Sequence, residues 1–183
     1  MSKPNIILTG FMGTGKTTVG RLMADKLAYE FIDTDQLIEP QVGCTIAEYF
    51  RSHGEAAFRQ RESELARELS GRDGLVISTG GRMMLDPANA AALSKTGRVF
   101  CLVATPEEIL QRVSHDENER PLLQVPNPLE HIVRLLKERE EGYRRFVQIR
   151  TSGKEPQSLA AEIIDLAFGA DTGTSDCPRT TCH

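Results

Sequence analysis

The sequence contains no tryptophan, and aromatic residues make up only 5% of its 183 positions. This scarcity argues against a surface on which the bases of a single-stranded nucleic acid could stack. The formal net charge of -4 gives no general attraction for nucleic acid or for an acidic membrane, so any anion must be held by local clusters of lysine and arginine. We therefore expect neither a nucleic-acid partner nor a membrane partner.

Long apolar runs and paired cysteines are also missing. No segment approaches the length needed to cross a bilayer, and the first residues lack the pattern of a secretory signal, which predicts a cytoplasmic protein. The cysteines form no CxxC motif, and Cys101 lies in an apolar run, which predicts a small core residue. Cys177, Cys182 and His183 are residue types that bind metals, but the polar, small-residue composition of the tail 170–183 favours a frayed terminus.

What the sequence does contain is an alternation of short β-branched runs with longer amphipathic segments. This pattern is typical of an α/β domain in which helices cover a parallel sheet, and the length suits one domain over residues 1–169. The predicted strands are Asn5–Thr9, Tyr29–Asp33, Leu75–Thr79, Arg98–Val103 and Val147–Thr151. The predicted helices are Lys16–Leu27, Ala56–Ser70, Asp86–Leu93, Glu107–Val113, Leu129–Tyr143 and Gln157–Phe168.

The strongest motif lies between the first predicted strand and the first predicted helix. Residues 10–17, GFMGTGKT, fit the phosphate-binding pattern GxxxxGK[ST]. Gly10, Gly13 and Gly15 can adopt positive φ and let a polyphosphate approach the backbone N–H groups at a helix N-terminus. Lys16 supplies a cation for the β and γ phosphates, and the Thr17 hydroxyl is a suitable Mg²⁺ ligand. A simple helix-capping turn is the alternative, but every motif position is filled and both flanking elements are predicted.

Two aspartates follow the second predicted strand in the segment FIDTDQLIE. The carboxyl ends of parallel strands form the ligand crevice of a doubly wound sheet, so Asp33 and Asp35 should lie beside the phosphate loop. One carboxylate can hold Mg²⁺ through water, while the other accepts a proton from a substrate hydroxyl. A solvated acidic turn explains the pair equally well when the pair is considered alone, and the neighbouring phosphate loop favours the functional interpretation.

Two further segments carry candidate substrate-binding groups. Arg59 and Arg61 lie in the segment GEAAFRQRE, and arginine is suited to bind a carboxylate with two parallel bonds while Glu62 holds it in place. Local sequence favours a surface role for Arg61 and leaves Arg59 undecided. Gly80 and Gly81 end the strand segment VISTGG, where bare backbone can touch a substrate closely, although a plain glycine turn is the alternative.

The segment 114–128, SHDENERPLLQVPNP, is polar and punctuated by prolines, with Arg120 in its middle. Its composition predicts a mobile segment rather than a packed element.

Taken together, these segments resemble the shikimate kinases of the nucleoside-monophosphate-kinase-like group. The resemblance spans residues 6–168 and depends on GFMGTGKTTVGR, FIDTDQLIE, GEAAFRQRE, STGG, RPLL at 120–123 and REEGY at 139–143. It implies a three-layer P-loop kinase fold with a five-stranded parallel sheet in the order 2-3-1-4-5. It also implies substrate-binding helices at about 36–70 and a lid at about 114–128.

The resemblance further implies a monomer that uses ATP and Mg²⁺ to phosphorylate the 3-hydroxyl of shikimate. Lys16, Asp35 and Arg120 would be catalytic, with Asp35 contacting the ring hydroxyls and acting as or orienting the base. Thr17 and Asp33 would organise the metal, the latter through water. The acceptor would be bound by Asp35, Arg59, Gly80, Gly81 and Arg139. ATP would be bound by Gly13, Thr14, Gly15, Lys16, Thr17, Thr18, Arg112, Arg120, Lys154 and Pro156.

Two residues depart from the family pattern. The family usually has a third glycine after STGG, where this chain has Arg82, which could crowd the acceptor pocket, add a cation to it or point outward. The usual leucine before the tyrosine of the last motif is Gly142, which is expected to loosen that helix end. Two other functions stay open: a kinase of another small hydroxylated acid such as gluconate, and a nucleotide-binding regulatory module without transfer activity.

Overall fold

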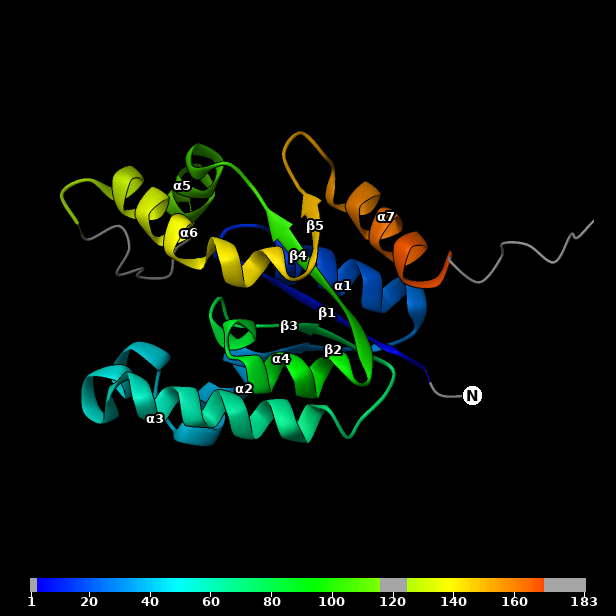
Figure 1. Ribbon diagram of the computed structural model, residues 1–183, viewed down its shortest axis with the longest axis horizontal. Helices are drawn as coiled ribbons and strands as arrows, with labels where there is room; N and C mark the ends of the chain where they lie inside the picture. Colours follow the sequence, from blue (N-terminus) through cyan, green and yellow to red (C-terminus); the bar gives the residue numbers. More distant parts are fainter. Residues whose placement is uncertain (1–2, 116–124, 170–183) are drawn as a thin grey trace, which may run out of the picture.

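A five-stranded parallel sheet forms the centre of the molecule, with strand order β2-β3-β1-β4-β5 (Figure 1). The computed structural model describes residues 3–115 and 125–169. The strands are β1 (Asn5–Gly10), β2 (Glu30–Asp33), β3 (Leu75–Ser78), β4 (Gly97–Val103) and β5 (Val147–Arg150). All four strand pairs are parallel, which confirms the predicted sheet and its order.

The central strand β1 is buried along its whole length. Its residue Ile7 pairs with Ile77 of β3 on one side and with Val99 of β4 on the other. A central parallel strand is covered by helices on both faces, which explains why its sequence is a continuous apolar run rather than an alternating one.

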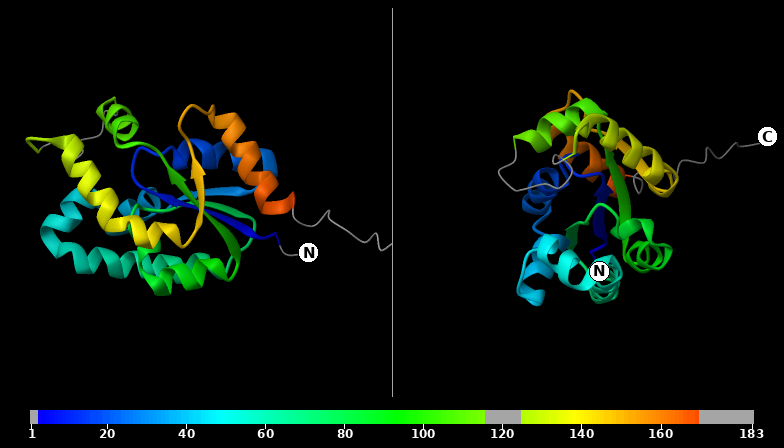
Figure 2. Two further views of the ribbon diagram at one scale, coloured as in Figure 1. Left: turned by 45° about the horizontal axis from the view of Figure 1, so that its top comes forward. Right: turned by 90° about the vertical axis from the view of Figure 1, so that its left-hand side faces the viewer.

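Helices cover both faces of the sheet (Figure 2). Ile7 and Ile77 pack against residues of α3 and α4, whereas Leu8 and Val76 pack against residues of α1 and α7 on the opposite face. A third, smaller cluster joins Phe11 to α5 and α6. The helices are α1 (Lys16–Leu27), α2 (Thr34–Val42), α3 (Ile46–Leu69), α4 (Pro87–Ser94), α5 (Pro106–Ser114), α6 (Pro128–Arg144) and α7 (Pro156–Phe168), and a short 3-10 helix η1 spans Met83–Leu85.

The predicted helix starts before α4 and α5 are confirmed by their caps. Asp86 accepts hydrogen bonds from the backbone of the first turn of α4. Thr105 forms a reciprocal capping box with Glu108 at the start of α5, and Pro106 occupies the first turn. Local side chains thus satisfy the backbone N–H groups at these two helix starts.

The largest difference from the predicted elements is in α3. This helix begins at Ile46, well before the predicted start at Ala56, and Thr45 caps it with Glu48 in a capping box. Gly54 interrupts it with φ of 79° and ψ of 170°, so that two helical pieces meet at a kink. The first piece, residues 46–53, is too short to show the long apolar stripe that indicates the second piece.

Part of the predicted organisation lies outside the described residues. This applies to Arg120, to most of the predicted lid at about 114–128, and to the tail 170–183 with its two cysteines and His183. Within the described ranges, no helix is long and apolar enough to cross a membrane. Cys101 is fully buried, which confirms its predicted place in the core.

Candidate active site

Three of the predicted site segments follow the carboxyl ends of β1, β2 and β3, which lie side by side in the sheet (Figure 1). The glycine-rich loop follows β1, the two aspartates lie where β2 passes into α2, and the glycine pair follows β3. Parallel strands that lie side by side bring these distant segments to one edge of the sheet.

The phosphate loop adopts the backbone geometry that its glycines predict. Gly10, Gly13 and Gly15 have φ of 130°, 73° and 93°. A Cβ at Gly10 would collide with the carbonyl oxygen of Leu102, whereas a Cβ at Gly15 would meet nothing within 4 Å. Gly10 is therefore required by close packing against β4, and Gly15 by its conformation at the N-terminus of α1.

Lys16 and Thr17 connect the loop to its surroundings. Lys16 Nζ donates to the carbonyl oxygens of Gly10 at 3.0 Å and Phe11 at 2.9 Å. Thr17 Oγ1 donates to Asp33 Oδ2 at 2.9 Å, so the first turn of α1 and the end of β2 are held together. The other carboxylate oxygen of Asp33 accepts from backbone N–H groups and caps α2.

Asp35 lies against Gly80 in a partly buried position. A Cβ at Gly80 would come within 2.6 Å of Asp35 Oδ1 and 3.0 Å of Glu62 Oε1, so a side chain here would have to displace these carboxylates. The Gly80 N–H donates to Thr34 Oγ1 at 2.8 Å, which fixes the glycine against α2. Burial and, to a smaller extent, the charge of Asp33 raise the pKa of Asp35 to about 6, and Lys16 opposes the rise.

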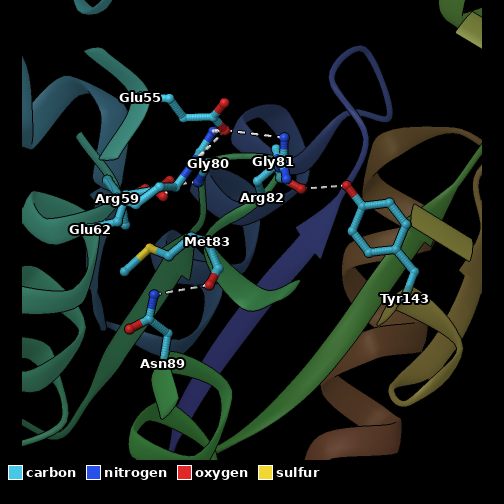
Figure 3. Close-up of polar contacts among 10 residues, drawn as sticks. Glu55, Arg59, Glu62, Gly80, Gly81, Arg82, Met83, Asn89 and Tyr143 are labelled. Atoms are coloured by element: carbon cyan, nitrogen blue, oxygen red, sulfur yellow. Dashed lines mark hydrogen bonds and ion pairs between the residues drawn. The ribbon is translucent and has the colours of Figure 1, made fainter. Parts of the chain in front are cut away.

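Arg59 is held by two glutamates of its own helix (Figure 3). Its Nη1 donates to Glu62 Oε2 at 2.6 Å, while Nε and Nη2 donate to Glu55 Oε1 at 3.2 and 3.1 Å. The guanidinium also lies over the rings of Phe50 and Phe58. The Glu62 side chain is only 1% exposed, and burial raises its pKa while Arg59 opposes the rise.

On the other side of the glycine pair, α6 contributes Arg139 and Tyr143. The Arg139 guanidinium lies 4.9 Å from the ring centroid of Phe11 in the phosphate loop. A Cβ at Gly81 would lie 3.5 Å from Arg139 Nη1. The Tyr143 hydroxyl donates to the carbonyl oxygen of Gly81, and burial raises its pKa to about 12, so it stays a neutral donor (Figure 3).

The other residues predicted to bind the nucleotide come from the phosphate loop, from α1 and α5, and from the start of α7 with the loop before it. Arg112 Nη1 donates to the Gly13 carbonyl oxygen and to Thr151 Oγ1, both at 3.2 Å. Lys154 pairs with Glu162 at 2.6 Å, and Pro156 is the first residue of α7. Thr14 donates through Oγ1 to the carbonyl oxygen of Phe11 at 2.7 Å. Thr18 is exposed in the first turn of α1.

Both departures from the family pattern have a defined environment. Arg82 Nη1 lies 3.1 Å from Glu55 Oε1, the oxygen that also binds Arg59, so its side chain adds a cation to this cluster. A Cβ at Gly142 would come within 2.6 Å of Leu85 Cδ2, and α6 continues through Gly142 to Arg144. The expected loosening of the helix end is therefore not observed, because the missing side chain lets α6 pack against η1.

Three residues of the site were not singled out for these contacts by sequence reasoning. Thr34 is a buried hydroxyl between the two aspartates, Glu55 lies four residues before Arg59, and Tyr143 ends the REEGY segment. The i, i+4 spacing of Glu55 and Arg59 was a usable signal, because such residues face each other on a helix. The partners of Thr34 and Tyr143 are distant in the chain, and no local pattern indicates them.

Comparison with known proteins agrees with this geometry. The family model described as shikimate kinase matches residues 12–167. A shikimate kinase of Thermus thermophilus is 45% identical over 161 residues, which cover 87% of this chain and 88% of that protein. A structure of the shikimate kinase from Acinetobacter baumannii in complex with shikimate is 41% identical, with a TM-score of 0.86 over 93% of this chain and 96% of that one.

More distant structures share the fold alone. A gluconokinase from Sinorhizobium meliloti has a TM-score of 0.57 and 18% identity, over 91% of this chain and 95% of that one. The family match and the close relatives decide the assignment: this chain belongs to the shikimate kinase family.

Proposed function

We propose that this protein transfers the γ-phosphoryl group of ATP to the 3-hydroxyl of shikimate. The observation that carries the proposal is the position of the adjacent glycines Gly80 and Gly81. Asp35 and the Glu62–Arg59 pair lie on one side of them, and Arg139 and Tyr143 lie on the other. This arrangement offers a base for a hydroxyl and cations for a carboxylate around one patch of bare backbone.

Asp35 is the group proposed to accept the proton of the acceptor hydroxyl. A base works best when its pKa lies near the working pH, and burial raises the pKa of Asp35 to about 6. A carboxylate with this pKa is ionised at neutral pH and is more basic than an ordinary aspartate. Arg59 and Arg139 would bind the acceptor carboxylate and so direct one hydroxyl of the ring toward Asp35.

The phosphate loop suits the donor. Positive φ at three glycines leaves the loop backbone open to phosphates at the N-terminus of α1, and Lys16 is anchored at the loop by its carbonyls. The Thr17 hydroxyl and the Asp33 carboxylate lie 2.9 Å apart and are the oxygen ligands that Mg²⁺ prefers, the aspartate through water. Mg²⁺ would neutralise phosphate charge there.

We propose the remaining contacts with ATP from the resemblance to the shikimate kinases alone. Arg112 and the segment with Lys154 and Pro156 would surround the adenine, and Thr18 would contact a phosphate beside Thr17. Arg120, outside the described residues, would close over the phosphates from the lid and exclude water. We also propose a monomer in the cytoplasm, where ATP is supplied.

The direct test is ADP release coupled to shikimate addition. We expect saturable turnover with shikimate far above the ATPase background, and no turnover in Lys16→Met. Gluconate and a panel of other hydroxy acids and polyols should react poorly. A faster reaction with gluconate would replace the proposed acceptor while leaving the kinase assignment intact.

A regulatory role without transfer is the remaining alternative from the sequence. Saturable nucleotide binding with no phosphoryl transfer to any acceptor of the panel would favour it. The ionisable Asp35 beside the glycine pair argues for transfer, because a binding module has no use for a buried base.

A further inference from the structure

The part of the proposed acceptor site that α3 forms carries an unusual charge arrangement. Arg59 is contacted by two carboxylates, Glu55 at 3.1 Å and Glu62 at 2.6 Å. One guanidinium beside two carboxylates has a net charge of about -1. Such an arrangement would repel the carboxylate of an anionic acceptor rather than attract it.

Arg82 neutralises this excess negative charge. Its Nη1 lies 3.1 Å from Glu55 Oε1, the oxygen already shared by two nitrogens of Arg59 (Figure 3). With Arg82 the cluster holds two arginines and two glutamates, and its formal charge is zero. Arg82 also opposes the raised pKa of the buried Glu62, so its field reaches across the cluster.

The position of Arg82 explains how one residue can influence Arg59 without touching it. Arg82 follows Gly80 and Gly81 directly and precedes η1, whereas Glu55 begins the second piece of α3 just after the kink at Gly54. Both side chains are 50% exposed, and their ion pair adds to the Arg59 contacts that already hold Glu55. The pair also joins the kinked helix to the loop that follows β3.

We propose that Arg82 is a positioning residue for acceptor binding, which acts by balancing the charge of Glu55 and holding it against Arg59. The proposal rests on the proposed function, because it needs an acceptor with a carboxylate at Arg59. Arg82 thus favours anionic acceptors without taking part in the transfer step. The positive charge of Arg82 compensates the negative charge of Glu55, the second glutamate that contacts Arg59.

The test is the kinetics of Arg82→Ala with shikimate as acceptor. We expect KM for shikimate to rise roughly three- to tenfold, with kcat within about twofold of the parent and KM for ATP unchanged. Arg82→Lys should recover most of the loss, because it restores the charge. The difference between parent and Arg82→Ala should shrink at high salt, which screens the half-exposed charges.

Glu55→Gln separates this role from direct contact with the acceptor. If Arg82 acts by balancing the charge of Glu55, Arg82→Ala should have little effect once that charge is gone. KM for shikimate in the double variant Arg82→Ala with Glu55→Gln should then lie within about twofold of KM in Glu55→Gln alone. A KM that stays raised in the double variant would show that Arg82 touches the acceptor itself and would overturn the proposal. If Arg82→Ala lowered both kcat and thermal stability, the proposal would also be overturned, in favour of a structural role for Arg82.

Arg61→Ala is the matched control. Arg61 lies on the same helix, is also 50% exposed and pairs with Glu64 at 2.9 Å. Its removal changes the net charge by the same amount, and KM for shikimate should stay unchanged. A parent protein without shikimate turnover would overturn both the proposed function and this inference. Parental turnover with an unchanged KM in Arg82→Ala would overturn the inference alone.

Discussion

The proposed site has a donor half and an acceptor half, which are built from different parts of the polypeptide. The donor half is the phosphate loop, residues 10–17, whose shape is set by backbone conformation at its glycines. The acceptor half comprises Asp35, Arg59, Glu62, Gly80, Gly81, Arg139 and Tyr143, which come from α2, α3, the loop after β3 and α6. The donor half therefore depends on φ angles within eight residues, and the acceptor half on side-chain contacts between distant elements.

The difference extends to electrostatics. In the donor half, charge comes from backbone N–H groups and from Lys16, which can meet the phosphates of any nucleotide. In the acceptor half, burial raises the pKa of both Asp35 and Glu62, so carboxylates are held where their charge is unfavourable. A backbone-built half binds a common chemical group, and a half built from paired charges can select one small molecule.

Asp35→Asn should have the largest effect, and it should separate the two halves. Loss of a general base is expected to lower kcat by about 10²- to 10⁴-fold, because the amide cannot accept the proton. Nucleotide affinity should stay close to that of the parent, since the donor half is intact. Coupled ADP release and equilibrium nucleotide binding measure the two quantities.

Asp165→Asn provides the control for that experiment. Asp165 is an exposed aspartate on α7, and its substitution should leave turnover unchanged. Turnover of Asp35→Asn equal to that of the parent would remove Asp35 from its proposed role. A matching loss of nucleotide affinity would show that the two halves are not separable.

Substitution of single glycines tests the backbone basis of the donor half. Gly10→Ala combines a φ of 130° with a collision against Leu102, and we expect a loss of unfolding free energy of about 3 kcal/mol together with weak nucleotide binding. Gly15→Ala has a φ of 93° but open space around the new Cβ, and should cost about 1 kcal/mol. Chemical denaturation measures both. Equal losses would show that the collision contributes nothing.

The same division explains what the sequence could predict. The strands, the sheet order and the start of α1 follow from local patterns and from the resemblance, and the structure confirms them. The phosphate loop was recognisable because its signal lies in consecutive residues. Its glycines adopt the positive φ that the motif requires.

The acceptor half could be predicted only in part. Local spacing left Arg59 undecided, because its burial against Glu62 and its contacts with two phenylalanine rings depend on how α3 packs. The role of Tyr143 needs Gly81, which is 62 residues away in the chain. The sequence marks Arg82 as a departure from the family pattern, but its pairing with Glu55 depends on how the kinked helix α3 lies beside the loop after β3.

The pH dependence of stability should report the cost of ionising the buried carboxylates of the acceptor half. The folded state keeps a proton on Asp35 up to about pH 6, whereas the ordinary pKa of this group is 3.8. The folded protein therefore binds more protons than the unfolded chain between these values, and stability should fall as the pH rises through this window. Without nucleotide and metal, we expect a fall on the order of 3 kcal/mol from Asp35.

Asp35→Asn should reduce that fall and be more stable than the parent above about pH 6. Denaturation midpoints between about pH 4 and pH 8 measure the difference. A smaller slope of the same sign should persist in the variant, because burial also raises the pKa of Glu62. Identical pH profiles for parent and variant would mean that Asp35 ionises normally in the ligand-free protein.

Tyr143→Phe is the mildest change to the acceptor half and tests whether its backbone is held by a distant side chain. The tyrosine hydroxyl donates to the carbonyl oxygen of Gly81, and the residue is only 5% exposed. Removal of the donor leaves a carbonyl without this partner, which should cost about 1 kcal/mol of stability. KM for shikimate should rise a few-fold, while KM for ATP stays unchanged.

Tyr29→Phe gives the comparison that makes this small effect interpretable. Tyr29 packs edge-on against Phe168, with ring centroids 6.5 Å apart, away from both halves of the site. It also loses one hydroxyl, but KM for either substrate should stay at the parental value. If Tyr143→Phe raised KM for ATP and for shikimate together, Gly81 would serve both halves. If Tyr143→Phe raised only KM for shikimate, Gly81 would belong to the acceptor half alone.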